Sequence, residues 1–207
     1  EKLQAIDLPR APKVTATKQR PAEKQLIDLA HRFVSCAKGV IIAGPRDGAI
    51  DENEETLAKH VQLLAASLGW PILAEPGSGI RARLSNQDEL IAPADVILRG
   101  EQVAATFAPE LVLRFGKTPT SKVVRLWAAK YARETIVIDP NPVWHDPDAV
   151  VTEVVQASAA DVFEGLGRYL ENSSRDEKWL GDWQRASAVA ENTIASLCEE
   201  SFWEGAV

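Results

Sequence analysis

The sequence predicts an α/β protein with a doubly wound, mostly parallel sheet, an extended N-terminal linker and a C-terminal helical tail. Short, continuously apolar runs alternate with longer segments whose apolar residues recur every three or four positions. The first pattern is typical of strands buried on both faces, and the second of helices that cover them. The 207 residues, 45% of them hydrophobic, suit one large domain or two small ones and exclude a disordered chain.

The expected elements follow one another from residue 21 to residue 170. The run 39–44 is the most apolar, and a strongly periodic segment follows it. We therefore expect the central strand at Gly39 to Ala43, followed by a crossover helix capped by Asp51 or Asn53. Before it, Pro21 opens a helix that ends near Gly39. The other expected strands are 70–75, 96–100, 110–116, 134–140 and 150–156, and the other expected helices are 121–132 and 157–170.

Both ends of the chain differ from this alternating part. The first twenty residues carry two prolines and little periodicity, which is typical of an extended linker. From residue 175 onward one helical stripe holds two tryptophans and needs a surface to pack on, either the domain itself or a missing part of the protein. The sequence has no methionine, so we expect a piece of a longer protein, divided into a linker (1–20), a domain (21–172) and a helical linker (173–207).

Charge and hydropathy exclude two classes of partner. The 23 Lys+Arg residues oppose 30 Asp+Glu residues, for a formal net charge of −7, whereas nucleic-acid binding needs a clustered basic surface. No apolar run approaches the roughly 20 residues that span a bilayer, and no signal peptide is evident. We therefore expect no nucleic-acid or membrane partner and a cytoplasmic location. Cys36 and Cys198 lie in apolar helical contexts and are expected to be reduced core thiols.

The sequence offers no catalytic residue and no metal site. Residues 77–82, GSGIRA, match a dinucleotide-binding pattern after a strand, but no helical stripe follows them, which favours a flexible loop over a nucleotide site. The three histidines are far apart, and none has a cysteine or carboxylate at ligand spacing. Ser78 and Ser121 have no evident base partner, and the nucleophile-elbow and P-loop motifs are absent from the sequence.

The best candidate for recognition is the segment 114–125, where a strand, a loop and a helix start follow one another. Backbone N–H groups, a helix N-terminus and nearby cations are expected to bind one anion there, since ligands of open α/β sheets bind beyond the carboxyl ends of strands. The expected occupant is a cyclic or aromatic carboxylate acting as a regulator, or a carboxylate of a partner domain. The alternative is a capped helix with solvated lysines. The expected anion-binding residues are Arg81, Arg114, Lys117 and Lys122.

Four stretches of sequence carry a family resemblance. ELVLRFGKTPTSKVVRLW (110–127), WPILAEPGSGIR (70–81) and VIDPNPVWHDPDA (137–149) resemble the 2-succinyl-5-enolpyruvyl-6-hydroxy-3-cyclohexene-1-carboxylate synthases. These are thiamine-diphosphate-dependent transferases of menaquinone and phylloquinone biosynthesis. LPRAPKVTAT (8–17) is similar to the exit from that family's first domain.

The resemblance implies the middle domain of a three-domain, homo-oligomeric enzyme, with a six-stranded Rossmann-like sheet. It implies thiamine diphosphate and Mg2+ bound by the two other domains, because the chain has no Gly-Asp-Gly magnesium motif. The implied reaction is decarboxylation of 2-oxoglutarate and addition of the succinyl-semialdehyde unit to isochorismate, with the cofactor performing the carbanion chemistry. This segment alone is then structural and catalytically silent, with no bound cofactor. The alternative is a module of another thiamine-diphosphate enzyme that binds FAD or ADP.

Overall fold

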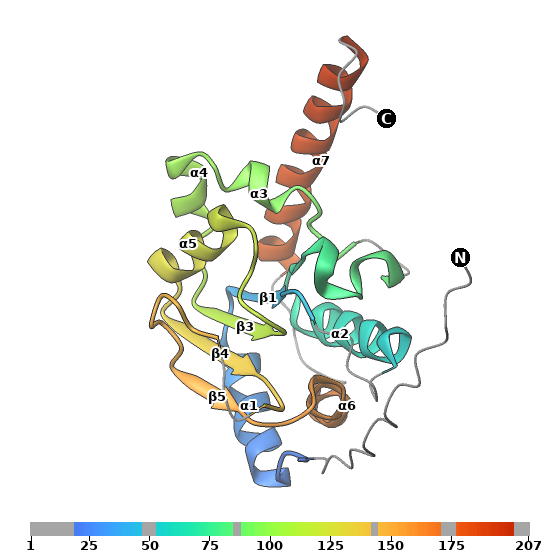
Figure 1. Cartoon of the computed structure of the whole chain (residues 1–207), viewed down its shortest axis with the longest axis vertical. Helices are drawn as coiled ribbons and strands as arrows, with labels where there is room; N and C mark the ends of the chain where they lie inside the picture. The colour runs from blue at the N-terminus through green and yellow to red at the C-terminus, as the bar shows by residue number, and fades with distance from the viewer. Residues whose placement is uncertain (1–18, 47–52, 85–87, 142–144, 171–176, 201–207) are drawn as a thin grey trace, which may run out of the picture.

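The computed structural model describes residues 19–46, 53–84, 88–141, 145–170 and 177–200. Five parallel strands form one sheet in the order β2-β1-β3-β4-β5, with helices on both faces (Figure 1), which confirms the predicted α/β class. The strands are β1 (Gly39–Ala43), β2 (Ile72–Ala74), β3 (Leu111–Phe115), β4 (Glu134–Ile138) and β5 (Glu153–Val155). The helices are α1 (Glu23–Ser35), α2 (Glu54–Leu68), α3 (Ala94–Ile97), α4 (Glu101–Thr106), α5 (Lys122–Tyr131), α6 (Ala159–Leu170) and α7 (Glu177–Glu200), with short 3-10 turns η1 (Pro76–Ser78) and η2 (Arg81–Arg83).

The two faces of the sheet bury two separate hydrophobic cores. Successive side chains of a strand point to opposite faces, so Ile41 of β1 enters one core while its neighbours Val40 and Ile42 enter the other. Helices α1, α2 and α6 cover the first face, and α3, α4, α5 and α7 cover the second. Both faces are therefore apolar, which explains why the strands appear in the sequence as continuous apolar runs.

The strand order corrects one expectation. β3, not β1, is the middle strand of the five, because β4 and β5 add to the sheet beyond β3 while β2 alone adds beyond β1. At the β2 edge, Leu90 makes an isolated parallel bridge to Ile72, in the position of a sixth strand. The described part of the chain thus holds five strands where the resemblance implied six.

The expected strand at 96–100 is also wrong. This stretch begins inside α3, where Ile97 is buried and Val96 is 47% exposed, a helical and not an alternating pattern. Arg99 pairs with Asp95 one helical turn earlier. A short apolar run does not by its length alone distinguish a strand from a buried helix. Each of the other expected strands contains an observed one.

Helix starts follow the capping chemistry of the sequence. The Asn53 side chain caps α2 by accepting hydrogen bonds from the N–H groups of Glu55 and Thr56. Asp51, the other expected cap, lies outside the described residues, as does almost all of the expected linker 1–20.

Neither Cys36 nor Cys198 forms a disulfide, and both are half-buried. Burial raises the pKa of the Cys36 thiol to about 11.

Helix α7 begins as part of the domain core. Trp179 and Trp183 are buried, and the indole N–H of Trp179 donates to the carbonyl oxygen of Gly39 at 2.8 Å. Trp183 packs on Phe107 and Trp127, with ring centroids 4.3 and 5.8 Å away. The tail stripe therefore packs on the domain itself over its first half. No helix within the described ranges has the length and apolarity needed to cross a membrane.

Candidate functional site

The ends of β1 and β3 form the switch point of the sheet, because the chain leaves β1 toward one edge and β3 toward the other. Cofactors of open α/β sheets bind in the crevice at this point. Here the Gly44 N–H donates to the carbonyl oxygen of Phe115 at 3.0 Å, and the Lys117 N–H donates to that of Pro45 at 2.8 Å. A Cβ atom on Gly44 would lie 1.9 Å from the Lys117 carbonyl oxygen. Backbone therefore fills the space between these two strand ends that a cofactor diphosphate would need.

The N-terminus of α5, the expected anion-binding helix start, holds a carboxylate of the chain itself. The N–H groups of Thr120 and Ser121 donate to the two carboxylate oxygens of Glu75 at 2.8 and 2.7 Å. The Ser121 hydroxyl accepts from the Val124 N–H at 3.2 Å, which caps the helix, and donates to Asp95. That hydrogen bond lowers the pKa of Asp95 below its ordinary value. A helix N-terminus attracts negative charge, and Glu75 supplies it here.

Arg114, at the end of β3, is a buried cation. Its side chain is 7% exposed, and its guanidinium donates to the Thr118 hydroxyl at 3.1 Å and to the carbonyl oxygen of His145. Burial lowers the pKa of Arg114, and the nearby carboxylates of Asp146, Asp139 and Asp148 oppose that effect. Arginine stays protonated in proteins, so β3 delivers a permanent positive charge to this edge.

A pocket lies beside Thr118 and His145, the two hydrogen-bond partners of Arg114. The Thr118 hydroxyl, which accepts from Arg114, also hydrogen-bonds the His145 carbonyl oxygen at 3.0 Å. The Asp146 carboxylate accepts from the N–H groups of Val150 and Val151 at 3.1 and 3.0 Å, so it fixes the turn that closes one side. The pocket is lined by Lys117, Thr118, His145, Asp146 and Pro147.

The structure places one of the four expected cations in the lining of this pocket and a second behind it. Lys117 is in the lining, and Arg114 lies behind Thr118 and His145. Arg81 lies in η2 and donates to the carbonyl oxygens of Ala74 and Ala92 at 3.2 and 3.4 Å. In the chain, β2 precedes η2. In the sheet, β1 lies between β2 and β3, so Arg81 follows a strand that is not adjacent to β3. Lys122 is exposed on the first turn of α5 and is not in the lining.

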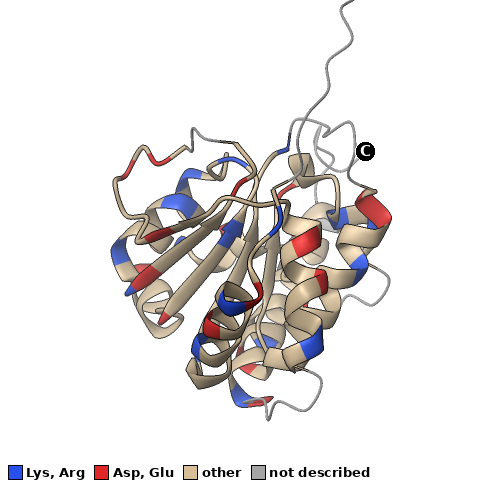
Figure 2. Ribbon diagram, turned by 90° about the horizontal axis from the view of Figure 1, so that it is seen from below, with Lys and Arg blue, Asp and Glu red and all other residues tan. Residues whose placement is uncertain are grey.

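The expected anion-binding set did not include His145, Asp146 and Pro147, although the family resemblance rests in part on the turn at Asp146 and Pro147. The available signal was the Asp-Pro pair at 146–147 after a strand, which marks a turn at the carboxyl edge. Elsewhere in the domain, Figure 2 shows basic and acidic residues interspersed along the same helices. Within the described ranges, no group of three or more His, Cys, Asp or Glu residues is placed to hold a metal ion.

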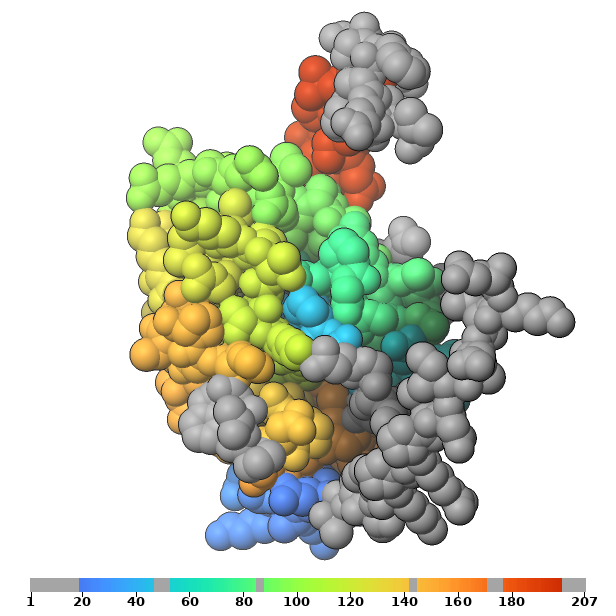
Figure 3. Space-filling view, in the orientation of Figure 1, coloured from blue at the N-terminus to red at the C-terminus, as the bar shows by residue number. Residues whose placement is uncertain are grey.

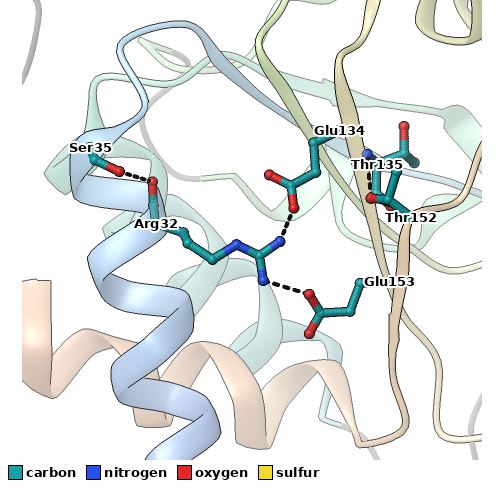
Figure 4. A network of polar contacts seen from close by, with 6 residues as sticks. All are labelled: Arg32, Ser35, Glu134, Thr135, Thr152 and Glu153. Carbon is teal, nitrogen blue, oxygen red and sulfur yellow. Dashed lines mark hydrogen bonds and ion pairs between the residues drawn. The ribbon is translucent and has the colours of Figure 1, made fainter.

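The amino edge of the sheet carries a different polar network (Figure 4). Arg32 of α1 forms ion pairs with Glu134, the first residue of β4, and with Glu153, the first residue of β5. Beside them the Thr152 hydroxyl accepts from the Thr135 N–H at 3.1 Å and donates to the Thr135 carbonyl oxygen at 2.9 Å. This network fastens α1 and the β4-β5 edge together and shows no feature of a binding site.

The chain is similar to known proteins over most of its length. Residues 11–207 match the family described as "Middle domain of thiamine pyrophosphate". The chain is similar to the 2-succinyl-5-enolpyruvyl-6-hydroxy-3-cyclohexene-1-carboxylate synthase of Geobacillus kaustophilus, at 30% identity over 96% of this chain and 33% of the relative. The synthase of Chloroflexus aurantiacus is 32% identical over 93% of this chain and 32% of the relative. That of Listeria monocytogenes serotype 4b is 31% identical over 76% of this chain and 26% of the relative, so this chain spans at most a third of these relatives.

Proposed function

The chain belongs to the family of thiamine pyrophosphate enzyme middle domains, and from this premise we propose that it serves a 2-succinyl-5-enolpyruvyl-6-hydroxy-3-cyclohexene-1-carboxylate synthase. The observation that carries the proposal is similarity to such synthases over more than nine-tenths of the chain. The whole enzyme would be a cytoplasmic homo-oligomer of quinone biosynthesis. It would decarboxylate 2-oxoglutarate and add the resulting unit to isochorismate.

The described residues of this domain do not fit the cofactors of that reaction. No metal-ligand cluster is present among them for Mg2+, and the switch point is joined by backbone hydrogen bonds. We therefore assign thiamine diphosphate and Mg2+ to the other domains. The role of this chain is to position those domains, with no chemical step of its own.

Turnover measurements test this assignment. We expect the full-length protein to release CO2 from 2-oxoglutarate in the presence of isochorismate, thiamine diphosphate and Mg2+. We expect the 207-residue chain to show no turnover under the same conditions. A full-length protein inactive on these substrates would overturn the synthase assignment. Turnover by the isolated chain would instead move the catalytic site into this domain.

We also propose the division of the chain into a linker (1–20), a domain and a helical linker, with one refinement. Trp179, Trp183 and Ala190 belong to the second hydrophobic core, so the domain extends beyond residue 172 and through the first half of α7. A chain ending at residue 172 is then expected to unfold at a markedly lower temperature than one ending at residue 192. Equal melting temperatures would restore the earlier boundary.

For the pocket, we propose a carboxylate site whose cations are Lys117 and the buried Arg114, with Arg81 and Lys122 outside it. Calorimetric titration with isochorismate and with benzoate tests it. Lys117→Ala is expected to weaken binding by about tenfold, the loss of one charge-assisted contact. Lys122→Ala removes the same charge nearby and is expected to leave binding unchanged. Equal weakening by both variants would indicate non-specific attraction.

A further inference from the structure

Helix α7 carries one apolar stripe, but the body of the domain covers only its first half. The stripe residues follow one another at spacings of four and three, the pattern of a helix that packs along a single seam. Their exposed fractions rise along the helix, from 0% at Trp183 and 7% at Ser187 to 9% at Ala190, 38% at Ile194 and 59% at Leu197. The apolar stripe therefore continues beyond the part of α7 that the body of the domain covers.

The first half of α7 is firmly held. Trp183 packs against Phe107 and Trp127, and Gln184 donates to the carbonyl oxygen of Asp88 at 2.8 Å. The C-terminal part of α7 extends away from the sheet and its covering helices, as its red ribbon and its atoms show in Figures 1 and 3. We call residues 191–200 the distal half of α7. It continues the anchored helix without a break.

Charge changes at the same point along the helix. The first half carries both signs, with Asp182 paired to Lys178 and to Arg185. The distal half has three glutamates in its sequence, at 191, 199 and 200, and no lysine or arginine. Two distal halves packed on each other would bring like charges together, which disfavours association. The charge pattern therefore favours an occupant other than a second copy of this helix.

We infer that the distal half of α7 docks, through Ile194 and Leu197, onto an apolar surface rimmed by lysine or arginine on another domain of the same polypeptide. The inference rests on the proposed function, in which this chain is one domain of a longer enzyme. The relatives extend over about three times its length. An exposed apolar stripe on a segment whose charged residues are all glutamates in the sequence fits a partner of opposite charge.

Hydrogen exchange tests the docking. Backbone amides of residues 191–200 are expected to exchange at least tenfold more slowly in the full-length protein than in the 207-residue chain. The double variant Ile194→Asp, Leu197→Asp is expected to abolish that protection. Val189→Asp is the matched control, because Val189 is 68% exposed on the same helix but lies off the stripe. Equal exchange in the two proteins, or equal loss with the control, would overturn the inference.

Zero-length cross-linking identifies the partner. A carbodiimide is expected to join Glu191, whose side chain is exposed, to a lysine outside this domain in the full-length protein. Mixing isotope-labelled and unlabelled protein distinguishes cross-links within one polypeptide from those between copies. Cross-links only between copies, or none from Glu191, would overturn the inference. Synthase turnover is measured separately, so a failed docking and a failed functional assignment give different results.

Discussion

The two edges of the sheet are both closed by charged side chains, but in different surroundings. At the amino edge, Arg32 joins Glu134 and Glu153, and the three side chains are 35%, 34% and 41% exposed. At the carboxyl edge, Glu75 accepts two backbone N–H groups at a helix start, and Gly44 packs directly on the Lys117 carbonyl oxygen.

The difference concerns the carboxyl edge, where ligands of open α/β sheets bind and where this chain places its own groups. Exposed ion pairs contribute little to stability and weaken in salt. A carboxylate that neutralises a helix N-terminus takes the position that a ligand's anionic group would otherwise occupy. The carboxyl edge is thus internally satisfied at β1 and α5.

The largest effect is expected from Gly44→Ala. The new Cβ would lie 1.9 Å from backbone of the facing loop, so the two loops must separate. We expect the free energy of unfolding to fall by about 3 kcal/mol, the upper end of the usual range for overpacking. Gly167→Ala is the control, since its Cβ would have no neighbour within 4 Å, and alanine stabilises a helix interior by about 0.5–1 kcal/mol. Equal free energies of unfolding for the two variants, measured by urea denaturation, would contradict the close contact at Gly44.

Glu75→Ala is expected to cost about 2 kcal/mol, because two backbone N–H groups lose a charged acceptor. Glu75→Gln should recover part of that loss, since its amide oxygen still accepts. Glu101→Ala serves as the matched control: it removes an exposed glutamate paired with Lys130 and should leave the denaturation midpoint unchanged. Equal shifts of the denaturation midpoint for Glu75→Ala and Glu101→Ala would show that Glu75 stabilises the fold no more than an exposed surface glutamate does.

Arg32→Ala is expected to cost about 1 kcal/mol at low ionic strength, the usual scale of exposed ion pairs. The cost should largely disappear in about 1 M salt, where the screening length falls to about 3 Å. The cost of Glu75→Ala should persist in the same salt. Salt-dependent losses of equal size in the two variants would remove the distinction between the edges.

The smallest effect concerns pH at the carboxyl edge. The pKa of Asp95 is lowered from its ordinary value of 3.8, chiefly by the hydrogen bond from Ser121. The stabilisation is therefore fully present above that ordinary value and is lost as the pH falls through the lowered pKa. We expect the stability difference between the native protein and Asp95→Asn to stay constant above about pH 5 and to shrink in more acidic solution. A difference that grows on acidification would contradict the assigned hydrogen bond.

The sequence predicted the elements whose pattern is local. β1 and α2 followed from an apolar run and a three-four periodicity, and Asn53 capped its helix as expected. The stretch 96–100 was mistaken for a strand because its apolar run is too short to show a period. The middle strand was misplaced because strand order depends on crossovers between distant segments, and the apolarity of one run does not specify them.

The candidate site depended on such distant contacts. Ser121 could be identified as a cap from its own neighbours, but Glu75, which accepts from its N–H, lies 46 residues earlier in the chain. Arg81 and Arg114 both follow strands, yet β1 separates those strands, and each guanidinium donates to main-chain carbonyl oxygens of its own surroundings. Residue type and spacing indicated cations at the correct edge without indicating which of them share a pocket.

Calorimetric titration of the 207-residue chain tests whether the carboxyl edge of this domain, which is internally satisfied at β1 and α5, holds no cofactor. The ligands are ADP, FAD, and thiamine diphosphate with Mg2+, each added to the same preparation. No saturable heat of binding is expected for any of the three ligands. Saturable binding of any one, weakened by substitutions in the loops after β1 and β3, would contradict it.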